Sequence, residues 1–83
     1  MKFTASWWHT GIGGRHRQHE TCDTVDEARK VLALNMSYSR DVEPISVVDS
    51  NGGSWPFDIV DEMQKLTDDD FWEYGLEPPG PIT

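Results

Sequence analysis

The chain has 83 residues, of which 36% are apolar, and a formal net charge of −8. A chain of this length forms one domain with a small core, because folding removes only about 60% of its unfolded surface from water. Its single cysteine excludes an intramolecular disulfide and, with it, the disulfide-stapled class of small secreted domains. No segment has the length and apolarity of a signal peptide or a membrane span, so we expect a cytoplasmic protein with no membrane partner.

The first predicted element is a β-hairpin. Over residues 2–10, Phe3, Ala5 and Trp7 alternate with Thr4, Ser6 and Trp8, which is the period of a half-buried strand. The glycine-rich segment 11–14 predicts a tight turn, because glycine adopts the positive φ that such turns need. Residues 15–22 form the predicted return strand. This strand is so polar that we expect it at an edge of the sheet or facing solvent.

The next element is a helix over about residues 25–37. Thr24 and Glu27 have the spacing of a capping box, in which each side chain accepts a hydrogen bond from the other residue's backbone amide. The residues expected to face the core follow the helical period and include one polar member: Ala28, Val31, Leu32, Asn35 and Met36. Arg29 and Lys30 lie off this stripe.

Two further strands are predicted in the middle of the chain. The β-branched run after Pro44 indicates a strand over residues 45–49. The segment 49–53 contains Asn-Gly, which predicts a reversal. Residues 54–57 then read as a short edge strand, because Pro56 cannot donate to a ladder. Alternatively, Pro56 occupies the first turn of the next helix, which would remove this strand.

Two short helices are expected near the C-terminus. Asp58 is the predicted N-cap of the first, whose apolar positions are Ile59, Val60, Met63 and Leu66. Thr67 is the predicted N-cap of the second, which has three aspartates in its first turn, reaches Tyr74 and ends at Gly75. The Pro/Gly-rich residues 77–83 suit an extended, mobile tail.

These elements predict the α+β class. Their order is β-β-α-β-β-α, with a final helical turn. We expect a small, mainly antiparallel sheet that is covered on one face by helices. The predicted organisation is one domain over residues 1–76 and a flexible tail over 77–83.

The charges are unevenly distributed. Residues 1–40 carry six Lys/Arg against four Asp/Glu, a charge of +2, whereas residues 41–83 carry one Lys against eleven Asp/Glu, a charge of −10. This acidic half opposes direct binding to nucleic acid and attracts a basic protein surface. The simplest alternative is that this charge only keeps the protein soluble. The predicted partner-binding residues are those of the two C-terminal helices: Asp61, Glu62, Asp68, Asp69, Asp70, Trp72 and Glu73.

The adjoining residues Phe71 and Trp72 cannot both face the core if the short helix packs by one stripe. One of them should therefore lie at the acidic surface as an apolar anchor, which is the type of side chain that dominates interface energies.

The N-terminal hairpin offers an alternative surface, made of Trp8, Arg15, Arg17 and His19. A nest of backbone amides in the glycine turn, beside Arg15, His16 and Arg17, suits an anion or a nucleotide. Cations beside aromatic rings also suit single-stranded nucleic acid, although no RNA-binding signature is present. A third alternative is self-association through Trp8 and the unpaired edge at residues 15–22.

Catalytic, metal and cofactor chemistry have little support in the sequence. His9, His16, His19 and Cys22 are zinc-type ligands, but strand alternation separates His19 from the others. The glycine turn lacks the third glycine of a dinucleotide fingerprint, and the Walker pattern is absent. No serine has a nucleophile-elbow context. We therefore expect a non-enzymatic protein without metal or cofactor.

Two segments carry a resemblance to known proteins: Thr24 to Arg29, in the pattern Thr-x-Asp-Glu-Ala-Arg, and Val47 to Gly53, which ends in Asp-x-Asn-Gly-Gly. With the preceding hairpin, they make roughly residues 1–57 similar in architecture to small uncharacterised proteins encoded by bacteriophages. In size and charge the chain also resembles phage inhibitors of bacterial defence, such as anti-CRISPR proteins. Those inhibitors share no common motif, so the resemblance assigns no functional residue. The −10 half, the four tryptophans and the missing catalytic set lead to the main hypothesis, which is a stoichiometric, non-enzymatic inhibitor or adaptor that binds a basic surface, such as a nucleic-acid-binding groove of a host protein machine.

Overall fold

The computed structural model describes residues 1–78 and contains four strands and three helices. The elements follow the predicted order: β1 (Phe3–Gly11), β2 (Gly14–Cys22), α1 (Val25–Tyr38), β3 (Val42–Asp49), β4 (Ser54–Trp55), α2 (Ile59–Lys65) and α3 (Asp68–Glu73). The strands form one antiparallel sheet in the order β2-β1-β3-β4. The predicted α+β class is confirmed.

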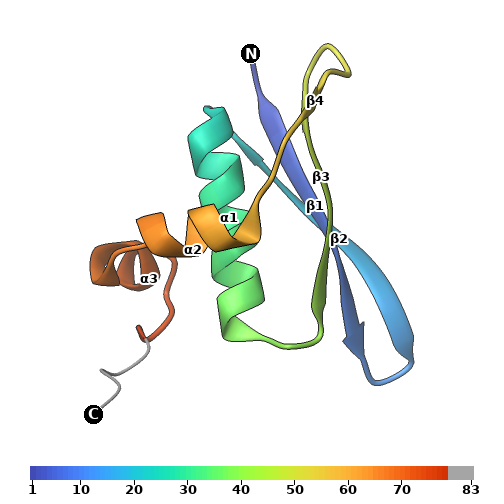
Figure 1. Ribbon diagram of the computed structural model, residues 1–83. Coiled ribbons are helices and arrows are strands. Elements are labelled where there is room, and N and C mark those ends of the chain that lie inside the picture. Colours follow the sequence, from blue (N-terminus) through green and yellow to red (C-terminus); the bar gives the residue numbers. More distant parts are fainter. Residues whose placement is uncertain (79–83) are drawn as a thin grey trace.

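The helices lie on one side of the sheet (Figure 1). Helix α1 packs along this side, α2 and α3 lie beside α1, and the far end of the β1–β2 hairpin extends past the helices. None of the helices in residues 1–78 lies over the opposite face of the sheet. The sheet therefore has one covered face, which faces α1, and one open face.

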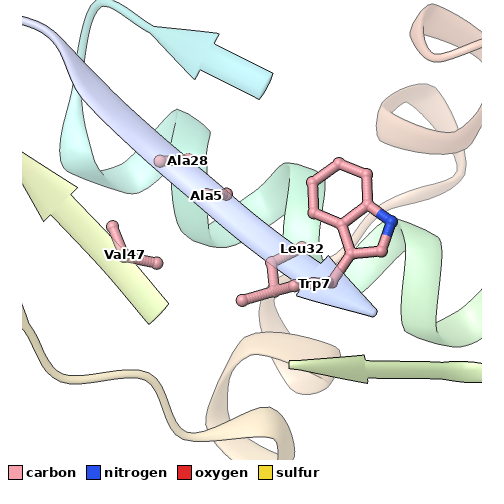
Figure 2. Close-up of a cluster of buried hydrophobic side chains, with 5 residues drawn as sticks. All are labelled: Ala5, Trp7, Ala28, Leu32 and Val47. Carbon is pink, nitrogen blue, oxygen red and sulfur yellow. The ribbon is translucent and has the colours of Figure 1, made fainter. Parts of the chain in front are cut away.

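The core forms between α1 and the covered face. Figure 2 shows its five members, which are Ala5 and Trp7 from β1, Val47 from β3, and Ala28 and Leu32 from α1. Ala5 lies opposite Val47 in the ladder, so their side chains share this face. Trp7 is the one large aromatic side chain in this five-residue cluster. Because a tryptophan buries a large apolar area, it lets a small number of residues form the core.

Helix α1 begins at the predicted residue, because the Thr24 hydroxyl accepts a hydrogen bond from the Glu27 amide at 3.1 Å. Only this half of the predicted capping box is formed among residues 1–78, since the Glu27 side chain does not accept from the Thr24 amide. The predicted stripe of α1 was too narrow. Ala33 and Leu34 are buried as well as Ala28 and Leu32, so the helix buries more than one side. Of the two residues that lie off the stripe, Arg29 donates a hydrogen bond to the Pro56 carbonyl and Lys30 forms an ion pair with Asp70 of α3.

Strand β3 is longer than predicted. It begins at Val42, and Pro44 lies inside it opposite Trp7. The register shifts at this point, since Ser6 pairs with Ser46 and Trp7 with Pro44, which leaves Ile45 as the extra residue of a bulge. A bulge tolerates the missing proline N–H, so Pro44 does not mark the start of the strand.

Strand β4 is shorter than predicted, with two residues, and it is an edge strand as expected. The alternative in which α2 starts at Pro56 is wrong. The N-cap is Asp58, whose carboxylate accepts from the amides of Val60 at 3.0 Å and Asp61 at 3.4 Å. The predicted apolar stripe of α2 is wrong at Val60, which is exposed, while Glu62 is buried. The expected extended tail falls mainly on residues 79–83, which lie outside the described part of the chain.

Candidate functional site

Helix α3 is a short helix with both ends fixed by hydrogen bonds. At its start, the Thr67 amide donates to Asp70 Oδ2 at 2.9 Å and the Asp70 amide donates to the Thr67 hydroxyl at 3.3 Å, which completes a capping box. At its end, Gly75 has a φ of 80° and Leu76 N–H bonds to the Phe71 carbonyl at 2.8 Å. These bonds satisfy backbone groups at both ends of the six-residue helix.

The two aromatic residues of α3 point in different directions. Phe71 is 7% exposed and packs inward, whereas Trp72 is 60% exposed. Asp68 and Asp69 are also exposed and precede Trp72 by four and three residues, so they share its side of the helix. We call Asp68, Asp69 and Trp72 the outer face of α3. The prediction that one of the two aromatic side chains lies among the acids is confirmed.

Two of the predicted partner-binding residues are mostly buried and contact lysines of the same chain, so they are not free to bind a partner. The side chain of Asp70 is 12% exposed and forms an ion pair with Lys30 of α1 at 3.0 Å. The side chain of Glu62 is 11% exposed and lies 3.4 Å from Lys65 Nζ. Asp61 and Glu73 remain exposed. The sequence pattern placed all of these acids on one surface because it could not show how α3 packs on α1.

The environment of Asp70 keeps its carboxylate charged. The hydrogen bond from the Thr67 amide, together with the one from Lys30, lowers the pKa of Asp70. The same contact raises the pKa of Lys30. The two groups therefore stay ionised at neutral pH and attach α3 to α1.

The alternative surface on the hairpin is brought together by the sheet. Trp8 pairs with Arg17, Ser6 with His19 and Thr10 with Arg15, so all four predicted hairpin residues point to the open face. The Arg15 guanidinium lies 4.7 Å from the centre of the Trp8 ring and 3.3 Å from Glu43 Oε2. Because Arg15 covers its ring, Trp8 is half-buried, so it is not the exposed side chain that the self-association alternative requires.

The glycine turn does not gather its basic neighbours. Gly13 and Gly14 have φ values of 93° and 111°, which accounts for glycine at these positions. Arg15 and Arg17 point to the open face, whereas His16 lies opposite His9 on the other side of the hairpin. The three side chains predicted to surround an anion therefore do not converge on the turn.

The metal-type side chains are divided in the same way. His9 and His16 are direct ladder partners, and His19 lies on the opposite side of the sheet. Cys22 packs against the core, and its burial raises the pKa of its thiol. Residues 1–78 hold no group of three side chains placed to bind a metal ion.

A groove that the sequence did not predict lies between the outer edge of β2, α1 and α3. Its volume is about 480 Å³. Val31, Leu34 and Tyr74 supply its apolar surface, and Glu20, Glu27 and Glu73 supply carboxylates. These residues are spread over 55 positions of the chain, so no local sequence signal could have identified the groove.

No protein family model matches the chain, and neither the curated proteins nor the solved structures include a match to it. Across residues 1–78, none of the helices combines the length and apolarity needed to cross a membrane. The predicted resemblance to small phage-encoded proteins stays a prediction.

Proposed function

We propose that this protein is a non-enzymatic binding module that docks the outer face of α3 on a basic surface of a protein partner. The observation that carries the proposal is Trp72, a large aromatic side chain 60% exposed on a helix whose neighbouring aromatic residue is buried. Tryptophan is enriched among the few residues that supply most of an interface's binding energy. Its exposure is explained if a partner covers it.

The residues around Trp72 indicate the chemistry of that partner. Asp68 and Asp69 lie one turn before it on the same side, and Glu73 is adjacent in sequence and exposed. Acidic side chains around an apolar anchor favour a partner with lysine and arginine around an apolar pocket, because complementary charge speeds association and selects the partner. The charge of −10 over residues 41–83 extends this attraction beyond the contact itself.

The way α3 is held supports binding with little loss of entropy. The capping box, the buried Phe71 and the ion pair between Asp70 and Lys30 fix the helix before any partner arrives. A surface that is already ordered loses less conformational entropy on binding. A basic groove that normally holds nucleic acid is one surface of this type, and its occupation would make the protein an inhibitor of the kind that the phage resemblance implies.

Comparative affinity capture from a bacterial lysate tests the proposal. The baits are the wild-type protein, a variant with Asp68→Lys, Asp69→Lys and Trp72→Ala, and a control with Asp26→Lys on α1. We expect a basic protein that wild type and the control retain at low salt and that the triple variant loses. Retention by all three baits, or no retained protein at either low or high salt, would contradict the proposal.

A further inference from the structure

The outer edge of β2 is a long, uncovered template for another strand. Strand β2 is the last in the sheet order, and its residues 14–19 are all exposed. Within residues 1–78, β1 is the one strand that pairs with it, so every second residue of β2 directs an unpaired N–H and C=O outward.

The two sides of this edge have opposite chemistry. On the open face, β2 presents Arg15, Arg17 and His19. On the other side, Glu20 and Cys22 lie opposite Ala5 and Phe3 of β1, which face the core, and the groove described above begins there. An added strand would place alternate side chains on these two sides.

The groove side carries a surplus of negative charge. Its two lysines are already paired, Lys2 with Asp23 and Lys30 with Asp70. Among residues 1–78, the carboxylates of Glu20, Glu27 and Glu73 form no ion pair with either lysine. Burial raises the pKa of the Tyr74 hydroxyl, which stays protonated and donates to Glu20 Oε2 at 3.3 Å. Beneath these acids lie Val31 and Leu34, which suit the aliphatic stems of lysine or arginine.

We propose that the β2 edge binds an extended segment of a partner protein as a fifth strand of the sheet. The segment carries Lys or Arg at alternate positions, which enter the groove, and Asp or Glu at the positions between, which lie over Arg17 and His19. The backbone hydrogen bonds supply affinity and the alternation of charge supplies specificity. Glu73 lines this groove and is also next to Trp72, but the site includes none of Asp68, Asp69 and Trp72, which define the outer face of α3, and does not depend on them.

A second copy of the chain is a poorer occupant of the same edge. If two copies pair their β2 strands in antiparallel fashion, with the two Gln18 residues opposite each other, then Arg17 of each copy lies opposite His19 of the other. Two basic rows then meet on the open face, and each copy carries a net charge of −8. Charge complementarity therefore favours a foreign segment.

Two octapeptides of equal composition test the proposal: an alternating (Lys-Glu)₄ and a block Lys₄Glu₄. Neither has a net charge from its side chains, so general attraction to an acidic protein is the same for both. We expect NMR titration to show saturable binding of the alternating peptide, with affinity at least tenfold higher than that of the block peptide. We also expect slower hydrogen exchange at every second amide of β2.

The matched variants are Glu27→Lys, in the groove, and Asp26→Lys, which is the neighbouring exposed acid and does not line the groove. Both make the same change of charge in the first turn of α1. We expect Glu27→Lys to weaken binding of the alternating peptide at least threefold relative to Asp26→Lys. Reversal of Asp68 and Asp69 should leave this binding unchanged, which keeps the test independent of the proposed function.

Three results would overturn the proposal. They are equal affinity for the two peptides, binding without protection of β2 amides, and equal effects of the two matched variants. Protection of β2 that grows with protein concentration in the absence of peptide, with a dimer in light scattering, would assign the edge to a second copy instead.

Discussion

Asp70 of α3 and Lys30 of α1 form an ion pair with 3.0 Å between Oδ1 and Nζ. The other carboxylate oxygen of Asp70 accepts the Thr67 amide at 2.9 Å, so this single side chain both starts α3 and attaches it to α1. Because it is mostly buried, it is distinct from Asp68 and Asp69, which precede it in the same helical turn and are exposed.

Replacement of Asp70 should therefore cost more stability than replacement of Asp69. Asp70→Ala removes the hydrogen bond that the Thr67 amide makes in the capping box and leaves Lys30 without its partner, so we expect the free energy of unfolding to fall by about 1–2 kcal/mol. Asp69→Ala, the matched control, should change it by less than about 0.5 kcal/mol. Urea denaturation followed by tryptophan fluorescence measures both, and equal effects would show that the buried contacts contribute nothing.

The same contacts predict loss of stability in acid. The hydrogen bonds from Thr67 and Lys30 lower the pKa of Asp70, and those from Gly53 and Trp55 lower the pKa of Asp49. A lowered folded-state pKa adds stability that is complete above the unfolded value, about 3.9 for aspartate, and is lost as the pH falls through the folded value. We expect the urea concentration at the unfolding midpoint to decrease as the pH is lowered below about 4. In Asp70→Asn, this decrease should be smaller. An unchanged pH profile in the variant would contradict the assignment.

The two aromatic residues of α3 should respond oppositely to truncation. Phe71→Ala removes a buried side chain and should lower the free energy of unfolding by about 3 kcal/mol or more. Trp72→Ala removes an exposed one, so stability should change by less than about 0.5 kcal/mol while partner capture is lost. Thermal unfolding and the capture experiment read the two effects separately. A large loss of stability in Trp72→Ala would mean that this side chain is structural.

A further prediction concerns the turn between β3 and β4. Asp49 accepts hydrogen bonds from the amides of Asn51 and Gly53 and from Trp55 Nε1, at 2.9, 2.8 and 3.0 Å. A Cβ on Gly53 would lie 2.6 Å from Asp49 Oδ2 and displace this carboxylate. We expect Gly53→Ala to lower the free energy of unfolding by about 1–2 kcal/mol. Gly11→Ala, which meets no atom within 4 Å, is the control and should be nearly neutral.

The sequence predicted the elements well where a local rule decides the outcome. Thr24, Asp58 and Thr67 cap helices as their positions indicated, and the glycine turn joins two paired strands. It failed where packing between distant segments decides. Pro44 lies inside β3, where a bulge tolerates it, and in α2 Val60 is exposed while Glu62 is buried.

The candidate sites divide in the same way. That either Phe71 or Trp72 faces solvent follows from helical spacing, but which one does so depends on contacts with α1. Asp70 could not be separated from Asp68 and Asp69, because its partner Lys30 lies 40 positions earlier in the chain. The groove beside β2 depends on three elements at once and had no signal in the sequence.

The central claim is that the outer face of α3 binds a basic partner, and the association rate with the captured protein tests it most directly. Stopped-flow fluorescence at low salt would compare three proteins: wild type, the double variant that carries both Asp68→Lys and Asp69→Lys, and the control Asp26→Lys. Because complementary charge acts mainly on association, we expect the double variant to bind at least tenfold more slowly, with a difference that shrinks as salt is added. If the folded double variant associates at the wild-type rate at low salt, the acidic residues of α3 only solvate the protein and the interface lies elsewhere.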